Sequence, residues 1–193
     1  MMAPFKNEPN LLAGPFARKG MGPKIESAAP EAKLPPPKPP SGVTVEDRIG
    51  IQAPAEVIWE IVHDLKSWSD WNPTYPKAAG EVRIGEVLDV TLVLEGQDPQ
   101  ALKPKVLDWI PNEQLHWELR MMGGMIKTIR YIEIEALGAE NCVVNNGEIF
   151  GGLMGPSLGK RVGRTVRRGF KAMNEALKAR AERNWARRKP LDA

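Results

Sequence analysis

Cysteine and histidine are among the scarcest side chains of this 193-residue sequence, which has one cysteine, Cys142, and two histidines, His63 and His116. A lone cysteine excludes an intramolecular disulfide and a multi-cysteine zinc site. Two histidines make a histidine-rich metal centre a poor interpretation. The sequence therefore indicates neither a metal nor a redox cofactor.

Long apolar runs are also missing. No stretch approaches the roughly 18 apolar residues that a membrane-spanning helix needs, and no apolar segment typical of a secretory signal follows the start. A cytoplasmic location is the resulting prediction. A mitochondrial transit peptide is the alternative, since Arg18 and Lys19 lie near the start, but Glu8 and several prolines accompany them.

Acidic residues are few at both ends of the chain. Residues 1–42 carry six lysines and arginines against three acids, residues 43–156 carry nine against eighteen, and residues 157–193 carry twelve against three. The formal net charge of +3 thus hides an acidic body with a basic C-terminal segment. Such a segment suggests an anionic membrane surface or an acidic protein as a partner. Nucleic acid is not expected, because few aromatic residues interleave with the basic ones.

Residues 1–42 show little hydrophobic periodicity and hold ten of the 18 prolines. The run Leu34-Pro35-Pro36-Pro37-Lys38-Pro39-Pro40 favours extended polyproline II and cannot join the interior of a sheet. We therefore predict a disordered Pro-rich N-terminal tail over residues 1–42. A spacer is its expected role, and a ligand for a proline-recognition domain is the alternative. A flexible C-terminus is expected over residues 188–193.

Residues 43–187 predict one α+β domain. Val43–Ile51 alternates as a first strand. Pro54 suits the first turn of a helix from about Ala55 to Leu65, and a short helical turn follows around Trp68 to Trp71. Six further strands of period two are predicted, with short turns that imply an antiparallel meander: Ala78–Val82, Val87–Leu94, Ala101–Trp109, Gln114–Met121, Lys127–Ala136 and Cys142–Phe150.

A long amphipathic helix is predicted from Ser157, a suitable N-cap, to about Arg187. Its apolar side chains recur at steps of three and four and form one narrow stripe, while its other faces are basic. A curved antiparallel sheet of seven strands can bury its apolar face against this stripe. The stripe consists of Leu158, Val162, Val166, Phe170, Met173 and Leu177, continued by Ala181 and Trp185.

Residues 43–183 contain a series of short motifs, each of which occurs once. They are Ala53-Pro54-Ala55-Glu56-Val57-Ile58-Trp59, Asp64-Leu65-Lys66-Ser67-Trp68-Ser69-Asp70-Trp71-Asn72-Pro73, Gly85-Glu86-Val87-Leu88, Leu115-His116-Trp117, Glu148-Ile149-Phe150-Gly151-Gly152 and Gly169-Phe170-Lys171-Ala172-Met173-Asn174-Glu175-Ala176-Leu177-Lys178.

These motifs resemble the SRPBCC superfamily, the START-like group that includes polyketide cyclase/dehydrase-type domains. The resemblance implies a helix-grip fold, in which a seven-stranded curved antiparallel sheet wraps around a long C-terminal helix, with two short helices after the first strand. It also implies a ligand pocket between the concave face of the sheet and that helix. The superfamily is defined by a pocket rather than by one reaction, so the resemblance leaves the activity open.

Alternation along the last two strands indicates which side chains face the pocket. The face that holds Tyr131 and Glu133 carries three charges, so the opposite face, with Arg130, is expected inward. A turn centred between Ala139 and Glu140 sets Arg130 opposite the positions near Glu148 and Ile149. A buried pair of Arg130 and Glu148 would anchor a carboxylate or carbonyl ligand. A salt bridge on the solvent face is the alternative.

The candidate catalytic residues are therefore Arg130, Glu148 and His116, the last as a general base. An ordinary strand residue is the alternative interpretation of His116. Large apolar side chains next to these positions complete the expected site, with core packing as their alternative role. The candidate ligand-binding residues are Trp109, Trp117, Met121, Arg130, Asn146, Glu148, Phe150, Phe170 and Met173.

The leading functional hypothesis is the binding of a small hydrophobic molecule, such as a lipid, an isoprenoid or a polyketide-like compound. One alternative is a polyketide cyclase/dehydratase-type enzyme that uses the same pocket. The other is an interaction protein that docks through its basic C-terminal helix. The oligomeric state is left open by the sequence.

Overall fold

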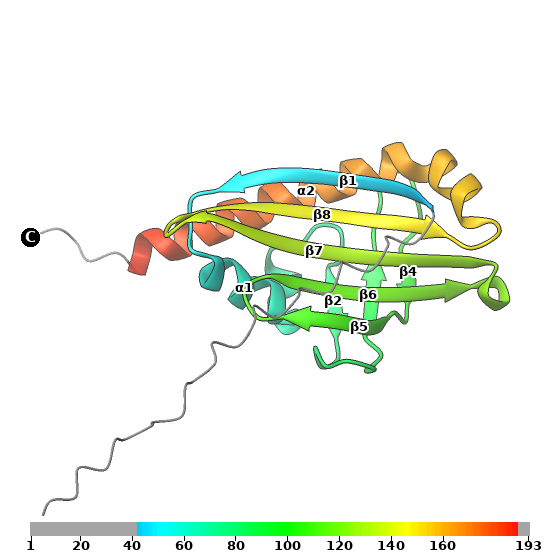
Figure 1. Ribbon diagram of the computed structural model, residues 1–193, viewed down its shortest axis with the longest axis horizontal. Coiled ribbons are helices and arrows are strands. Elements are labelled where there is room, and N and C mark those ends of the chain that lie inside the picture. The colour runs from blue at the N-terminus through cyan, green and yellow to red at the C-terminus, as the bar shows by residue number, and fades with distance from the viewer. Residues whose placement is uncertain (1–41, 189–193) are drawn as a thin grey trace, which may run out of the picture. The chain divides into compact units, whose positions relative to one another are not determined.

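The computed structural model describes residues 42–188 (Figure 1). The predicted tail up to Ser41 and the residues after Arg188 lie outside the described residues. In chain order the elements are β1 (Val43–Ile51), α1 (Ala55–His63), the 3₁₀ helix η1 (Leu65–Asp70), β2 (Lys77–Ala79), β3 (Asp89–Leu92), β4 (Gln100–Leu102), β5 (Lys105–Ile110), β6 (Gln114–Met121), the 3₁₀ helix η2 (Met122–Gly124), β7 (Ile126–Gly138), β8 (Asn141–Gly151) and α2 (Gly155–Arg188).

The strands form two antiparallel sheets. Five of them lie in the order β1-β8-β7-β6-β5, and β2, β3 and β4 form a smaller sheet. Figure 1 shows α2 running along the larger sheet, with the smaller sheet crossing it from the same side. The α+β class and the helix-grip arrangement are confirmed. The strand count is eight in two sheets, where the sequence predicted seven in one.

Pro104 accounts for the additional strand. The sequence predicted one strand over 101–109, but the structure divides it into β4 and β5 on either side of Lys103 and Pro104. Proline has no N–H to give to a ladder, which favours such a break. The Pro104 carbonyl instead accepts a hydrogen bond from the Leu88 amide at 2.8 Å. The chain therefore leaves the smaller sheet at β4 and enters the larger sheet at β5.

The start of α2 also differs from the prediction. The first intrahelical hydrogen bond runs from the Leu158 amide to the Met154 carbonyl at 3.1 Å, and the helix begins at Gly155. Met154 thus holds the N-cap position, and Ser157 lies inside the first turn. Gly152 adopts a φ of +81° in the preceding loop, where a Cβ would lie 2.6 Å from the Met125 carbonyl oxygen. Glycine is therefore needed to let β8 turn into α2.

The core lies between α2 and the concave face of the larger sheet. Phe170, Met173 and Leu177 are almost fully buried along the predicted apolar stripe of α2. At one end, α1 and η1 close the core, where Trp68 is buried and its Nε1 donates to the Val62 carbonyl at 3.1 Å. Trp59 of α1 stacks on Trp109 of β5 with centroids 6.1 Å apart. The tryptophans thus close and stiffen this end of the sheet.

Two absences concern the part of the chain that the structure describes. Over residues 42–188, no helix combines the length and apolar character that a membrane span needs. The same residues hold no cluster of three or more histidine, cysteine or acidic side chains placed to ligate a metal ion.

Candidate functional site

A cavity of about 330 Å³ lies between the N-terminal half of α2 and the two sheets. It occupies the place that the family resemblance implied, between the concave face and the C-terminal helix. Apolar side chains supply most of its wall, and five polar ones join them. The lining consists of Leu92, Leu94, Gln97, Gln100, Leu102, Leu119, Met121, Thr128, Glu148, Phe150, Leu158, Arg161, Val162 and Val166.

Thr128 and Glu148 are the polar groups that β7 and β8 contribute to this cavity. Burial raises the pKa of Glu148 above its usual range. A hydrogen bond with Thr128 and the positive charge of Arg130 both lower that pKa, but by less. The Glu148 carboxyl therefore holds its proton more tightly than an exposed glutamate does. It is suited to donate a hydrogen bond or to exchange a proton with an occupant of the cavity.

Arg130 lies directly opposite Glu148 in the β7–β8 ladder, one of the two adjacent positions that the sequence predicted. No ion pair joins the two side chains within residues 42–188, which is where the structure departs from the expected buried pair. Arg130 is only 2% exposed, and its Nη1 donates to the carbonyl oxygens of Tyr131 at 2.6 Å and Gly147 at 2.9 Å. These two carbonyls take the place of a carboxylate partner.

Aromatic rings surround the same guanidinium. Its carbon lies 4.0 Å from the ring centroid of Phe170, 5.4 Å from that of Trp117 and 6.0 Å from that of Tyr75. Arg130 Nη2 also contacts the Met173 sulfur at 3.8 Å. Contacts with π faces stabilise a cation in a site from which water is excluded. Arg130 is thus a buried positive charge next to the cavity, and it acts on Glu148 through space.

A chain of amides ties α2 to the sheet. Asn146 Nδ2 donates to Asn174 Oδ1 at 2.9 Å, and Asn174 Nδ2 donates to Asp47 Oδ2 at 2.8 Å and to the Asp47 carbonyl at 3.1 Å. Both asparagines are fully buried. Asn146, predicted to contact ligand, therefore fixes the position of α2 against β8 and β1.

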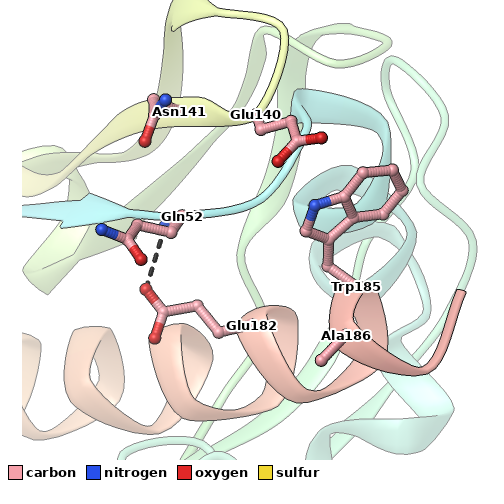
Figure 2. Close-up of a pocket in the computed structure, with 6 residues that line it drawn as sticks. All are labelled: Gln52, Glu140, Asn141, Glu182, Trp185 and Ala186. Atoms are coloured by element: carbon pink, nitrogen blue, oxygen red, sulfur yellow. Dashed lines mark hydrogen bonds between the residues drawn. The ribbon is translucent and has the colours of Figure 1, made fainter. Parts of the chain in front are cut away.

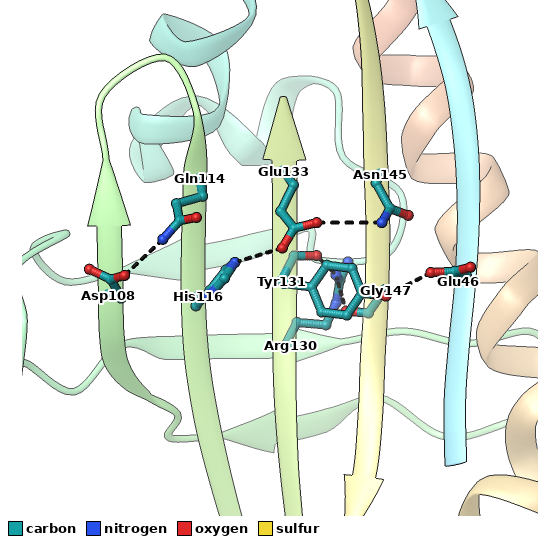
Figure 3. A network of polar contacts seen from close by, with 9 residues as sticks. All are labelled: Glu46, Asp108, Gln114, His116, Arg130, Tyr131, Glu133, Asn145 and Gly147. Carbon is teal, nitrogen blue, oxygen red and sulfur yellow. Dashed lines mark hydrogen bonds and ion pairs between the residues drawn. The ribbon is translucent and has the colours of Figure 1, made fainter. Parts of the chain in front are cut away.

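His116 lies on the face of the larger sheet that is turned away from α2 (Figure 3), which is the convex face, and it does not line the cavity. Its Nε2 is 3.2 Å from Glu133 Oε1, and the hydrogen bond with His116 is the main reason that the pKa of Glu133 is lowered. Asn145 Nδ2 donates to the other oxygen of Glu133 at 3.4 Å. The sequence hypothesis of a general base in the pocket thus does not match the position of His116. The alternation of Leu115, His116 and Trp117 places the histidine opposite the core.

Tyr131 extends this convex-face network toward β1. Its hydroxyl donates to Glu46 Oε2 at 2.9 Å (Figure 3). Burial, followed by the hydrogen bond to Glu46, raises the pKa of Tyr131 far above its usual value. The phenol therefore stays protonated and serves as a hydrogen-bond donor that joins β7 to the edge strand.

The predicted ligand-binding residues separate into two groups. Met121, Glu148 and Phe150 line the cavity. The others lie in the packing beyond its wall: Trp117, Phe170 and Met173 contact Arg130, Asn146 bonds Asn174, and Trp109 stacks on Trp59.

Sequence reasoning missed the wall formed by β3, β4 and the loop between them, which includes Leu92, Leu94 and Leu102. It also missed Leu119 and Thr128 on the larger sheet and Arg161 on α2. Alternation had placed Thr128 on the inward face together with Arg130. That was the available signal for one of these residues.

A second hollow, of about 280 Å³, lies where the C-terminal end of α2 meets the β7–β8 turn (Figure 2). The backbone N–H of Gln52 donates to Glu182 Oε1 across it at 2.9 Å. Its wall is mostly polar, unlike that of the larger cavity, so the cavity beside Glu148 is the better candidate for an apolar ligand. The wall consists of Gln52, Glu140, Asn141, Glu182, Trp185 and Ala186.

Comparison with known proteins agrees with this architecture. Residues 42–182 match the model of the family described as polyketide cyclase / dehydrase and lipid transport. No curated protein matches the chain.

Similar solved structures include the Zhui aromatase/cyclase from Streptomyces sp. R1128, at 18% identity and a TM-score of 0.61, covering 75% of this chain and 96% of that one. A START superfamily protein from Mycobacterium smegmatis shares 21% identity at a TM-score of 0.59, covering 73% and 98%. A norcoclaurine synthase from Thalictrum flavum shares 22% at a TM-score of 0.56, covering 75% and 98%. At these identities the likeness shows the fold alone.

Proposed function

Because this chain belongs to the polyketide cyclase/dehydrase and lipid transport family, we propose that it binds a compact hydrophobic molecule in the cavity between α2 and the sheets. The observation that carries this proposal is the character of the cavity wall. Leucine, valine, methionine and phenylalanine side chains from both sheets and from α2 supply most of it. Apolar walls with a few fixed polar groups are typical of small-molecule sites.

The size of the cavity favours a small ligand. Its volume of about 330 Å³ lies at the lower end of the range for small-molecule pockets, which is roughly 300–1,000 Å³. A molecule of one or two fused rings, or a short isoprenoid, suits this volume better than a long acyl chain. Thr128 and Glu148 provide polar contacts for a hydroxyl or carbonyl group of such a ligand.

Binding of N-phenyl-1-naphthylamine, an uncharged fluorescent probe, tests the proposal. We expect saturable binding to the full chain, and about a tenfold loss of affinity in Leu158→Trp, which fills the cavity from α2. Leu137→Trp, at an exposed position on β7, is the matched control and keeps the affinity. Equal affinity in the two variants would overturn the proposal. If the affinity falls only in Leu158→Trp, native mass spectrometry of protein purified from its own host would identify the natural ligand.

A second candidate function is proton transfer on the bound molecule, as in a cyclase or dehydratase. The raised pKa of Glu148 inside an apolar cavity favours it, because a carboxyl of this kind can act as an acid or a base. The two functions differ in turnover: a binding protein returns its ligand unchanged, and a dehydratase returns it lighter by one water. For an enzyme, Glu148→Gln should abolish turnover and leave binding of the naphthylamine probe intact.

A further inference from the structure

Four exposed apolar side chains gather at one end of the larger sheet. Met122 and Met125 lie in the β6–β7 connection, and Leu153 and Met154 lie in the β8–α2 connection. Leu153 is 85% exposed, more than any other large apolar side chain in the described part of the chain. The Met154 amide donates to the Met125 carbonyl at 3.0 Å and holds the two connections together. We call these four residues the apolar tip.

Exposed basic side chains stand next to the apolar tip, on the first turns of α2. Lys160, Arg161 and Arg164 form this basic flank, and none of the three has an ion-pair partner within residues 42–188. Residues 149–174 contain no aspartate or glutamate. Arg168, farther along α2, pairs with Glu95 at 3.1 Å. No acidic residue of the same segment therefore neutralises the positive charge of the basic flank.

We propose that the apolar tip and the basic flank dock the protein on the surface of an anionic lipid bilayer. Exposed methionines and leucines beside unpaired cations have the chemistry of an interfacial membrane contact, in which apolar groups enter the acyl boundary and cations meet headgroups. A site for single-stranded nucleic acid would present aromatic stacking platforms. The tip and the flank contain no aromatic residue.

The cavity reaches the same end of the molecule. Met121 and Leu158 line it and lie within four residues of the tip, and Arg161 belongs to both the flank and the cavity wall. A docked protein would thus present its cavity beside the bilayer, the natural reservoir of a hydrophobic ligand. The inference extends the proposed function, but its test needs no ligand, so either can fail while the other stands.

Cosedimentation of the full chain with lipid vesicles tests the docking. We expect binding to vesicles of phosphatidylcholine mixed with phosphatidylglycerol, weaker binding at high salt, and little binding to phosphatidylcholine alone. Lys160→Gln/Arg164→Gln should lower the partition coefficient about 25-fold, since each basic residue near the surface contributes about fivefold. Arg183→Gln/Arg187→Gln, exposed at the far end of α2, is the matched control and should bind more tightly than that double variant.

A second pair of double variants tests what the apolar tip contributes to vesicle binding. Leu153→Ser/Met154→Ser should lower the partition coefficient about tenfold. Leu137→Ser/Ile110→Ser removes exposed apolar side chains at the opposite end of the sheet and should leave it unchanged. Equal effects of the two pairs, or equal binding to the neutral and anionic vesicles, would overturn the proposal. So would tighter binding to a single-stranded oligonucleotide that the tip substitutions leave unaffected.

Discussion

The ring of Tyr131 on β7 lies directly over Gly147 on β8. The two residues are partners in the ladder, and a Cβ added at Gly147 would lie 2.2 Å from the Tyr131 hydroxyl oxygen. The absence of a side chain at Gly147 is what allows the phenol to cross β8 and reach Glu46 on β1. A glycine in the middle of a long strand thus has a packing reason.

Gly147→Ala should therefore destabilise the fold by about 2 kcal/mol, as overpacking in a confined site does. Urea unfolding measures the change. Gly50→Ala on β1, where an added Cβ has open space, is the control and should stay within about 0.5 kcal/mol of the original chain. If the clash is the cause, Gly147→Ala should cost much less in a Tyr131→Ala background. Additive effects would contradict this explanation.

Arg130 offers a test of what a buried charge contributes. Arg130→Ala should cost about 3 kcal/mol, because it leaves a cavity among Phe170, Trp117 and Met173. Arg130→Met keeps the volume and removes a desolvated charge that lacks a carboxylate partner, so it should stay within about 1 kcal/mol of the original chain. Thermal or urea unfolding of both variants decides. An equal loss in the two would mean that the carbonyl hydrogen bonds dominate.

The raised pKa of Glu148 should make the folded protein less stable as the pH rises. Its pKa is higher in the folded protein than in the unfolded chain, so above pH 4.5 the folded state binds more protons and stability falls as the pH rises through the raised pKa. Glu148→Gln should remove this decline and stabilise the protein at neutral pH by about 1 kcal/mol. Urea unfolding across a pH series measures it.

Thr128→Val sharpens the same test. The hydrogen bond with Thr128 lowers the pKa of Glu148, so its loss should move the decline in stability to higher pH. In the Glu148→Gln background, Thr128→Val should leave the pH dependence unchanged. A decline that survives in Glu148→Gln would assign it to another group.

Asn174 should be the most sensitive polar position on α2. Asn174→Ala removes the acceptor of Asn146 and the donor to Asp47 inside the core, and leaving such groups unpaired costs about 2–3 kcal/mol. Asn184→Ala, on the same helix, is the control and should change stability by less than about 0.5 kcal/mol. Because Asn146 and Asn174 bond each other, their alanine substitutions should not be additive.

The sequence predicted the strands best where alternation ended at clear turns. β1 and β6 have the predicted bounds. The predicted turn between Ala139 and Glu140 set Arg130 opposite Glu148 or Ile149, and Glu148 is the observed partner. Local periodicity carries this information because each strand buries one face. The break at Pro104 was also visible in the sequence, although the prediction ran a strand across it.

The candidate site was harder to predict, because a leucine in a cavity wall and a leucine in a packed core have the same periodicity. Leu92 and Leu102 line the cavity only because the smaller sheet crosses the larger one, which is a tertiary property. The direction of the Arg130 guanidinium could not be predicted from the sequence either. It depends on carbonyls and rings supplied by three separate elements.

The division of the chain at Pro104 has a kinetic consequence. β3 and β4 have only four and three residues, and the segment from Gly85 to Leu88 joins them to β5 through the bridge Val87–Lys105 and a few backbone hydrogen bonds. A small unit held in this way opens at a lower free-energy cost than the sheet unfolds. We expect the backbone amides of β3 and β4 to exchange with solvent faster than those of the other strands. The residence time of a ligand in the cavity should then depend on how often β3 and β4 open.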